Sequence, residues 1–130
     1  MEGKQRGMEI DDITKTAIGC AFKVHTALGP GLVESAYHRC LEHEIAKAGL
    51  LVESEVPLAI VYDGLRIERA FKIDLRVEKR VIVEIKAVET ILPVHKAQLL
   101  SYLQLSGIRV RLLLNFNVAH LLDGITRMMR

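Results

Sequence analysis

The stretch Val81-Ile82-Val83-Glu84-Ile85-Lys86 combines the composition of a buried strand with two charged side chains. Four of its six residues are β-branched and apolar, which is typical of a strand inside a sheet. Successive side chains of a strand alternate between its faces, so Glu84 and Lys86 share one face with Ile82. Burying both charges is costly unless each finds a partner. The stretch is therefore either a solvated Glu/Lys pair on an exposed sheet face or part of a functional site.

Length and composition predict one compact domain. The chain has 130 residues, half of them hydrophobic, and we expect a flexible N-terminus over residues 1–9 and a single domain over 10–130. The net charge of +2 is too small to indicate nucleic-acid binding by itself. Any basic face must come from local clustering, as of Arg66, Arg69, Lys72 and Arg76, and that spacing also fits the solvated side of one strand.

The two cysteines and the apolar runs exclude several classes of protein. Cys20 and Cys40 form no CxxC motif and no Cys/His pair with zinc spacing, so we expect two small buried residues. Residues 1–8 are polar and lack the apolar segment of a secretion signal. No apolar run approaches the roughly 18 residues of a membrane span. We therefore expect a soluble, cytoplasmic protein that does not associate with membranes.

Two helices are predicted in the first part of the chain. Either Asp11 or Asp12 can cap the first, which Gly29-Pro30-Gly31 ends. Its apolar stripe, at spacings of three and four, consists of Ile10, Ile13, Ala17, Ala21, Val24 and Leu28. The second helix is expected from about residue 32 to residue 48, followed by Gly49.

Three antiparallel strands and a crossover are predicted next. Residues 52–62 alternate in polarity, Pro57 indicates an edge or interrupted strand, and Asp63-Gly64 predicts a hairpin. In the return strand, apolar and polar residues are expected to alternate. The apolar positions are Leu65, Ile67, Phe71, Ile73 and Leu75, and the polar ones are Arg66, Glu68, Lys72, Asp74 and Arg76. A third helix begins near Pro93 and ends at Gly107, so the strand at 109–116 should lie parallel to the one at 81–86.

The predicted fold class is α/β, with helices and a mixed sheet in the order α-α-β-β-β-α-β. Residues 125–129 are compatible with a short last strand.

Asp74 is the residue that gives Glu84 a possible function. Adjacent strands lie about 4.8 Å apart, so the two carboxylates can approach each other. They repel unless one takes up a proton or a cation lies between them. Oxygen ligands select Mg²⁺, Mn²⁺ or Ca²⁺. Lys86 on the same face is suited to orient a metal-bound water or to stabilise charge on a phosphate.

Gln98 and Tyr102 lie four residues apart on one face of the third helix, where they can orient Lys86, a water or a nucleic-acid backbone. Each candidate also has a structural explanation. Asp74 can pair with an arginine, Gln98 can be a surface residue, and Tyr102 can be a core residue with a solvated hydroxyl. Glu34 in the first turn of a helix can simply favour the helix dipole.

In combination these residues resemble the PD-(D/E)XK nuclease superfamily, whose core is αβββαβ, here with an additional N-terminal helix. Asp74 followed by Glu84-x-Lys86 resembles the central motif, and Gln98-x-x-x-Tyr102 resembles a motif of its helicase- and CRISPR-associated branches. The match is closer to the GxxExxY family of this superfamily. Three segments carry that likeness, namely Gly31-Leu32-Val33-Glu34-Ser35-Ala36-Tyr37, Gln98-Leu99-Leu100-Ser101-Tyr102-Leu103 and Leu114-Asn115-Phe116.

The resemblance implies a role for each of these residues. Asp74 and Glu84 would bind Mg²⁺ or Mn²⁺ together with the backbone carbonyl of Ile85, and Glu34 would reach the metal directly or through water. Lys86 would be the catalytic lysine. Gln98 and Tyr102 would support the site. One departure is Ile73-Asp74, where the superfamily often has Pro-Asp.

The function implied is metal-dependent hydrolysis of phosphodiester bonds, in DNA more than in RNA. The alternative is a nuclease-like fold that binds nucleic acid or a protein partner without catalysis, and a structural oligomerisation protein ranks third. We also expect a homodimer, because apolar residues near the C-terminus exceed what one small core can bury. They are Leu121, Leu122, Met128 and Met129.

Overall fold

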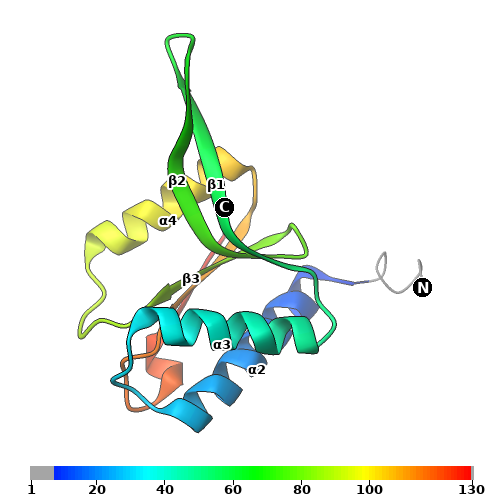
Figure 1. Ribbon diagram of the computed structural model, residues 1–130, viewed down its shortest axis with the longest axis vertical. Coiled ribbons are helices and arrows are strands. Elements are labelled where there is room, and N and C mark those ends of the chain that lie inside the picture. Colours follow the sequence, from blue (N-terminus) through cyan, green and yellow to red (C-terminus); the bar gives the residue numbers. More distant parts are fainter. Residues whose placement is uncertain (1–7, 130) are drawn as a thin grey trace.

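The computed structural model describes residues 8–129, so most of the flexible N-terminus expected over residues 1–9 lies outside the described residues. A single five-stranded sheet runs in the order β1-β2-β3-β4-β5 (Figure 1). The strands are β1 (Val52–Tyr62), β2 (Leu65–Val77), β3 (Val81–Lys86), β4 (Val110–Asn115) and β5 (Ile125–Met129). The helices are α2 (Ile10–Leu28), α3 (Glu34–Lys47), α4 (Pro93–Ser106) and the short 3-10 helix η1 (Leu121–Gly124).

The strand pairing agrees with the sequence prediction. β1, β2 and β3 form an antiparallel meander, and the crossover through α4 makes β4 parallel to β3. β5 is the anticipated last strand and pairs antiparallel with β4. The α/β class with a mixed sheet is therefore confirmed, and β1 is an edge strand, as Pro57 indicated.

Two helix starts differ from the prediction. The N-cap of α2 is Glu9, and Asp12 occupies the third helical position, where its side chain accepts a hydrogen bond from the Glu9 amide at 3.4 Å. α3 begins at Glu34, two residues later than expected, because Val33 is still extended. Met8 packs against the core, so the chain is held in place by packing before α2 begins.

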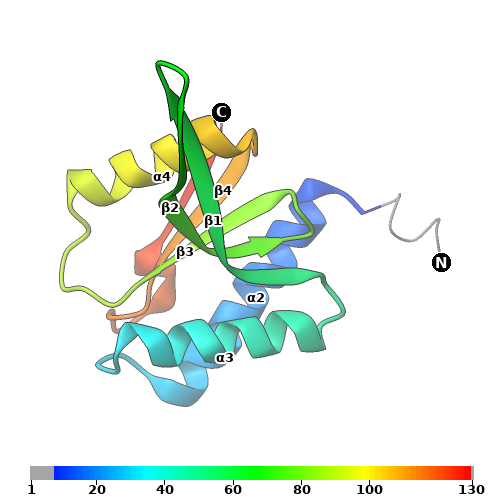
Figure 2. The ribbon, with the colours of Figure 1, turned by 45° about the horizontal axis from the view of Figure 1, so that its top comes forward.

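Helices cover both faces of the sheet (Figure 2). α2 and α3 pack on one face, against inward side chains of β3 and β4 such as Val83, Ile85 and Leu112. α4 covers the other face, where Leu99 and Tyr102 meet Ile82 and Leu113. Glu84 and Lys86 have the parity of Ile82, so they lie on the α4 face.

The hairpin of β1 and β2 changes faces partway along its length. Leu75 belongs to the core under α2 and α3, whereas Ile73 belongs to the core under α4. The predicted alternation is present in this part of β2, where Ile73 and Leu75 are buried, but the two side chains enter different cores. The change occurs at Asp74, opposite Glu55, whose φ of 54° breaks the regular pleat. Beyond this point the hairpin projects from the body of the molecule (Figure 1).

Within residues 8–129, none of the helices is long and apolar enough to cross a membrane. Cys20 is buried as expected, whereas Cys40 is only partly buried, and both thiols are free.

Candidate active site

Strands β2 and β3 separate at the two acidic residues. The ladder of paired residues ends at Leu75 and Val83, one position before Asp74 and Glu84 would meet. The carboxylates accept hydrogen bonds from backbone amides that have no partner in the ladder. The Asp74 amide donates to Glu84 Oε1 at 2.9 Å, and the Ile85 amide donates to Asp74 Oδ2 at 2.8 Å. This crossed pair of hydrogen bonds fixes both carboxylates side by side.

Each carboxylate keeps one oxygen that is not used in this exchange. Asp74 Oδ1 and Glu84 Oε2 make no hydrogen bond within residues 8–129. The carbonyl of Ile85 is directed to the same place, because the amide and carbonyl of one strand residue face the same neighbour and the Ile85 amide faces Asp74. The Ile85 carbonyl and one oxygen of each carboxylate are therefore available as acceptors where the two strands part.

The burial of Glu84 rejects the solvated Glu/Lys pair. Glu84 is only 6% exposed to solvent. Loss of hydration and, after it, the negative charge of Asp74 raise the pKa of the Glu84 carboxyl to about 8, although the hydrogen bond from the Asp74 amide and the charge of Lys86 oppose the shift. At neutral pH and without a cation, Glu84 is therefore protonated, which removes the repulsion between the two carboxylates.

Lys86 ends strand β3 on the same face as Glu84. Its positive charge lowers the pKa of Glu84, which places the ammonium within electrostatic reach of that carboxylate. Among residues 8–129 its Nζ atom makes no hydrogen bond or ion pair, and the side chain is partly exposed. The ammonium is thus positioned by the strand and remains available to a ligand.

Helix α4 brings Tyr102 to the carboxylates. The Tyr102 side chain is buried and packs edge-on against Phe71, with ring centroids 5.4 Å apart. Burial, followed by the charges of Glu84 and Asp74, raises the pKa of the Tyr102 hydroxyl to about 12, so it stays a proton donor. Gln98, one turn earlier, is exposed and makes no hydrogen bond within the described part of the chain.

Glu34 lies at the rim of the site. It is the first residue of α3, is exposed, and adds a small upward contribution to the pKa of Glu84. Together with Asp74 it lines a cavity of about 180 Å³. The remaining lining residues are Ser35, His38, Glu55 and Lys72.

Tyr37 supports the site in a way that the sequence did not reveal. Its hydroxyl donates to the Gly29 carbonyl at 2.6 Å and accepts from the Leu32 amide at 3.1 Å. The fully buried ring stacks on Phe116, with centroids 4.6 Å apart. Tyr37 therefore fixes the loop that sets where α3 and Glu34 begin. The signal for this role was the spacing of Glu34 and Tyr37 on one helix.

Asn115 anchors the chain on the other side. Its amide group exchanges two hydrogen bonds with the backbone of Val88, at 3.0 and 2.8 Å. Asn115 is paired with Lys86 in the parallel ladder. These bonds hold the segment that leaves β3 directly after Lys86.

The donor set fits a small divalent cation in part. No group of three or more His, Cys, Asp or Glu side chains that could hold a metal occurs within residues 8–129. Asp74 and Glu84 offer two carboxylate oxygens, to which the Ile85 carbonyl adds a third oxygen ligand. Mg²⁺ is commonly bound by one or two carboxylates, with water and substrate phosphate completing its six ligands. The site suits such a partly open coordination.

The fold and the paired carboxylates have the form of a nuclease core, and comparison with protein families agrees. Residues 11–128 match the family model PDDEXK_3, described as PD-(D/E)XK nuclease superfamily. The chain belongs to this superfamily. Neither the curated proteins nor the solved structures gave a significant match.

Proposed function

We propose that the protein is a metal-dependent nuclease that hydrolyses phosphodiester bonds with Asp74, Glu84 and Lys86. The observation that carries the proposal is the crossed hydrogen bonding of Asp74 and Glu84, which holds two carboxylates together at 2.8 and 2.9 Å from backbone amides. Loss of hydration and the neighbouring charge of Asp74 both disfavour the ionised form of Glu84, and a bound cation offsets both effects. Membership of the nuclease superfamily supports the same conclusion.

Asp74, Glu84 and the Ile85 carbonyl would hold Mg²⁺ or Mn²⁺. When bound, the ion supplies Lewis acidity and lowers the pKa of water. Lys86 Nζ, unpaired within the described residues and on the face of Glu84, orients the attacking water or stabilises charge on the phosphate. Tyr102 presents a protonated hydroxyl beside the carboxylates. Glu34, which lines the same cavity as Asp74, would reach the ion directly or through water.

We further propose that the protein belongs to the GxxExxY family and that its substrate is DNA rather than RNA. The first proposal is supported by Glu34 and Tyr37, which share α3 and are linked through the loop that Tyr37 holds. The second rests on a proposed homodimer, since two-fold symmetry would present two sites to the two strands of a duplex. Leu122 and Met129, respectively 71% and 64% exposed, are the apolar residues near the C-terminus that remain for such an interface.

Cleavage of labelled DNA and RNA with Mg²⁺ or Mn²⁺ tests the proposal, with Lys86→Met as the matched variant. The methionine keeps most of the apolar stem of the lysine and removes only its charge. We expect cleavage by the wild type to require the metal, and Lys86→Met to fold and bind metal but not cleave. Cleavage retained by the folded variant would remove Lys86 from the mechanism. A wild type that binds nucleic acid without cutting it under any metal would favour the non-catalytic binding module.

A further inference from the structure

The cavity beside the carboxylates contains a second pair of charged residues that the catalytic motif does not include. Lys72 lies two residues before Asp74 on β2, and Glu55 lies on the neighbouring strand β1. Lys72 Nζ is 3.0 Å from Glu55 Oε1. Both side chains are more than half exposed and line the same cavity as Glu34 and Asp74.

The backbone at Glu55 is unusual. Its φ of 54° is in the left-handed region, which residues other than Gly, Asn and Asp rarely adopt. Ser54 pairs with Leu75 and Val56 pairs with Ile73, so Glu55 stands across from Asp74 without a regular pair. Irregularities of this kind redirect side chains and concentrate near active sites. Here it directs a carboxylate towards the lysine that precedes Asp74.

Asp74 is an alternative partner for Lys72. Lys72 and Asp74 line the same cavity, and residues two apart along a strand lie roughly 7 Å apart, so the long side chain of Lys72 can reach either Glu55 or Asp74. If Lys72 paired with Asp74, it would neutralise a carboxylate that the proposed cation needs. Glu55 binds the Lys72 ammonium at 3.0 Å, and the Lys72 side chain is 58% exposed, so it remains open to a ligand.

We propose that Lys72 binds a phosphate of the nucleic-acid strand next to the one that is cleaved, and that Glu55 is the positioning residue that keeps Lys72 off Asp74. The proposal rests on the proposed nuclease function. A lysine ammonium binds phosphate as a point charge, without the planar geometry that arginine requires. The separation of Lys72 from Asp74 along β2 is of the order of the distance between successive phosphates, so one strand can contact both.

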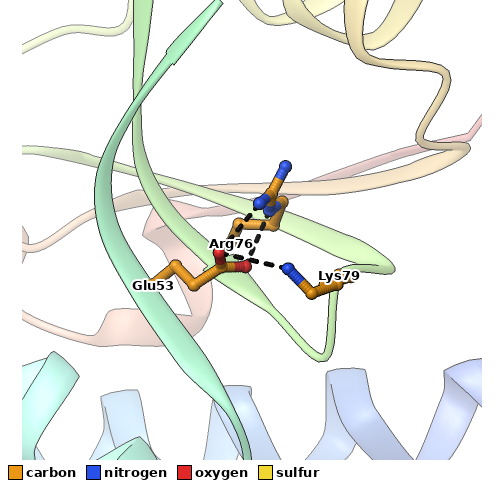
Figure 3. Close-up of polar contacts among 3 residues, drawn as sticks. All are labelled: Glu53, Arg76 and Lys79. Atoms are coloured by element: carbon orange, nitrogen blue, oxygen red, sulfur yellow. Dashed lines mark hydrogen bonds and ion pairs between the residues drawn. The ribbon is translucent and has the colours of Figure 1, made fainter.

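The chain provides a matched control for removing a lysine. Lys79 in the turn after β2 lies 3.3 Å from Glu53, which also binds Arg76 (Figure 3). Its side chain is 62% exposed, comparable with 58% for Lys72, and it is not among the residues that line the cavity. Lys79→Gln therefore removes the same charge and the same kind of ion pair as Lys72→Gln, elsewhere on the molecule.

The test is the salt dependence of binding to a short dye-labelled DNA duplex and to its single strand, by fluorescence anisotropy in EDTA. We expect Lys72→Gln to reduce the slope of log affinity against log salt by about 0.9 for the duplex or about 0.7 for the single strand. For the duplex, the ratio of the wild-type affinity to the Lys72→Gln affinity should then fall about threefold between roughly 50 and 200 mM salt. Lys79→Gln should keep the wild-type slope. KM for cleavage in Mn²⁺ should rise for Lys72→Gln alone.

The outcomes separate this inference from the proposed function. If the wild type binds or cleaves DNA and Lys72→Gln matches Lys79→Gln in slope and KM, the phosphate contact is refuted and the nuclease proposal stands. If the wild type neither binds nor cleaves DNA or RNA, the nuclease proposal fails, and the role of Lys72 fails with it.

The role of Glu55 has its own readout, the Mn²⁺ concentration that gives half of the maximal rise in melting temperature. When Glu55 is present, we expect Lys72→Gln to change this Mn²⁺ concentration little. In the Glu55→Gln background Lys72 can pair with Asp74, so there we expect Lys72→Gln to lower the Mn²⁺ concentration several-fold. Equal effects of Lys72→Gln in both backgrounds would show that only net charge matters, and would refute the positioning role.

Discussion

Replacing Glu84 by glutamine should change how the stability of the metal-free protein depends on pH. The carboxyl has a pKa of about 8 in the folded protein and 4.5 as its ordinary value. A raised pKa means that the folded state holds the proton more tightly than the unfolded chain does. The contribution of Glu84 to the free energy of unfolding is therefore most favourable below about pH 4.5. It becomes less favourable as the pH rises towards 8, and it is constant at higher pH.

The magnitude follows from these two values. One pKa unit corresponds to about 1.4 kcal/mol, so ionising Glu84 between roughly pH 5 and pH 9 costs on the order of 4 kcal/mol of unfolding free energy. Glutamine does not ionise, and its amide oxygen can still accept the hydrogen bond from the Asp74 amide. In a domain of this size each kcal/mol corresponds to about 4 °C in melting temperature. Glu84→Gln should thus melt above the wild type by roughly 10 °C or more near pH 9, and close to it near pH 5.

Urea denaturation of both proteins in EDTA, from about pH 5 to pH 9, measures this difference. The other titrating groups are shared, so the change in the difference with pH isolates Glu84. Two parallel stability curves would refute the reasoning. A variant less stable than the wild type at high pH would show instead that the Glu84 carboxylate is paired with a cationic group in the metal-free protein.

Two further predictions concern the support of the site and the assembly. Tyr37→Phe removes both hydrogen bonds to the loop at Gly29 and Leu32 and should destabilise the fold by about 1–3 kcal/mol, measured by urea denaturation; an unchanged midpoint would show that the loop is held by packing alone. Light scattering should give the mass of a homodimer, which replacement of the exposed Leu122 and Met129 by serine should dissociate. The mass of a monomer at high protein concentration would refute the proposed homodimer.

The sequence predicted the fold well because hydrophobic period and turn residues are local signals. Pro93 and Gly107 marked the ends of α4, and the crossover length required β4 to be parallel to β3. The features that the sequence did not reveal concern the path of the backbone. The strand pattern of β2 does not reveal a change of face at Asp74, because that change arises from the twist of a long hairpin and from the left-handed Glu55 on the opposite strand.

The candidate site was predicted in part for a similar reason. Asp74, Glu84 and Tyr102 were expected together and are brought together, since two of them lie on neighbouring strands and the third faces the sheet. The sequence did not show that each acid caps the backbone of the other strand, because this depends on where the ladder ends. Nor did it assign a role in the site to Tyr37 or Lys72, whose contacts depend on the loop before α3 and on the neighbouring strand β1.

The central claim is that Asp74 and Glu84 form one cation site, and calorimetry of Mn²⁺ binding near neutral pH tests it most directly. Because the pKa of Glu84 is about 8, roughly nine-tenths of the metal-free molecules carry its proton at pH 7, and binding must release it. Titrations in two buffers of different ionisation enthalpy should therefore show about one proton released per Mn²⁺ by the wild type. Glu84→Gln should release none and should bind more weakly. Absence of binding by the wild type, or binding without proton release, would contradict the account.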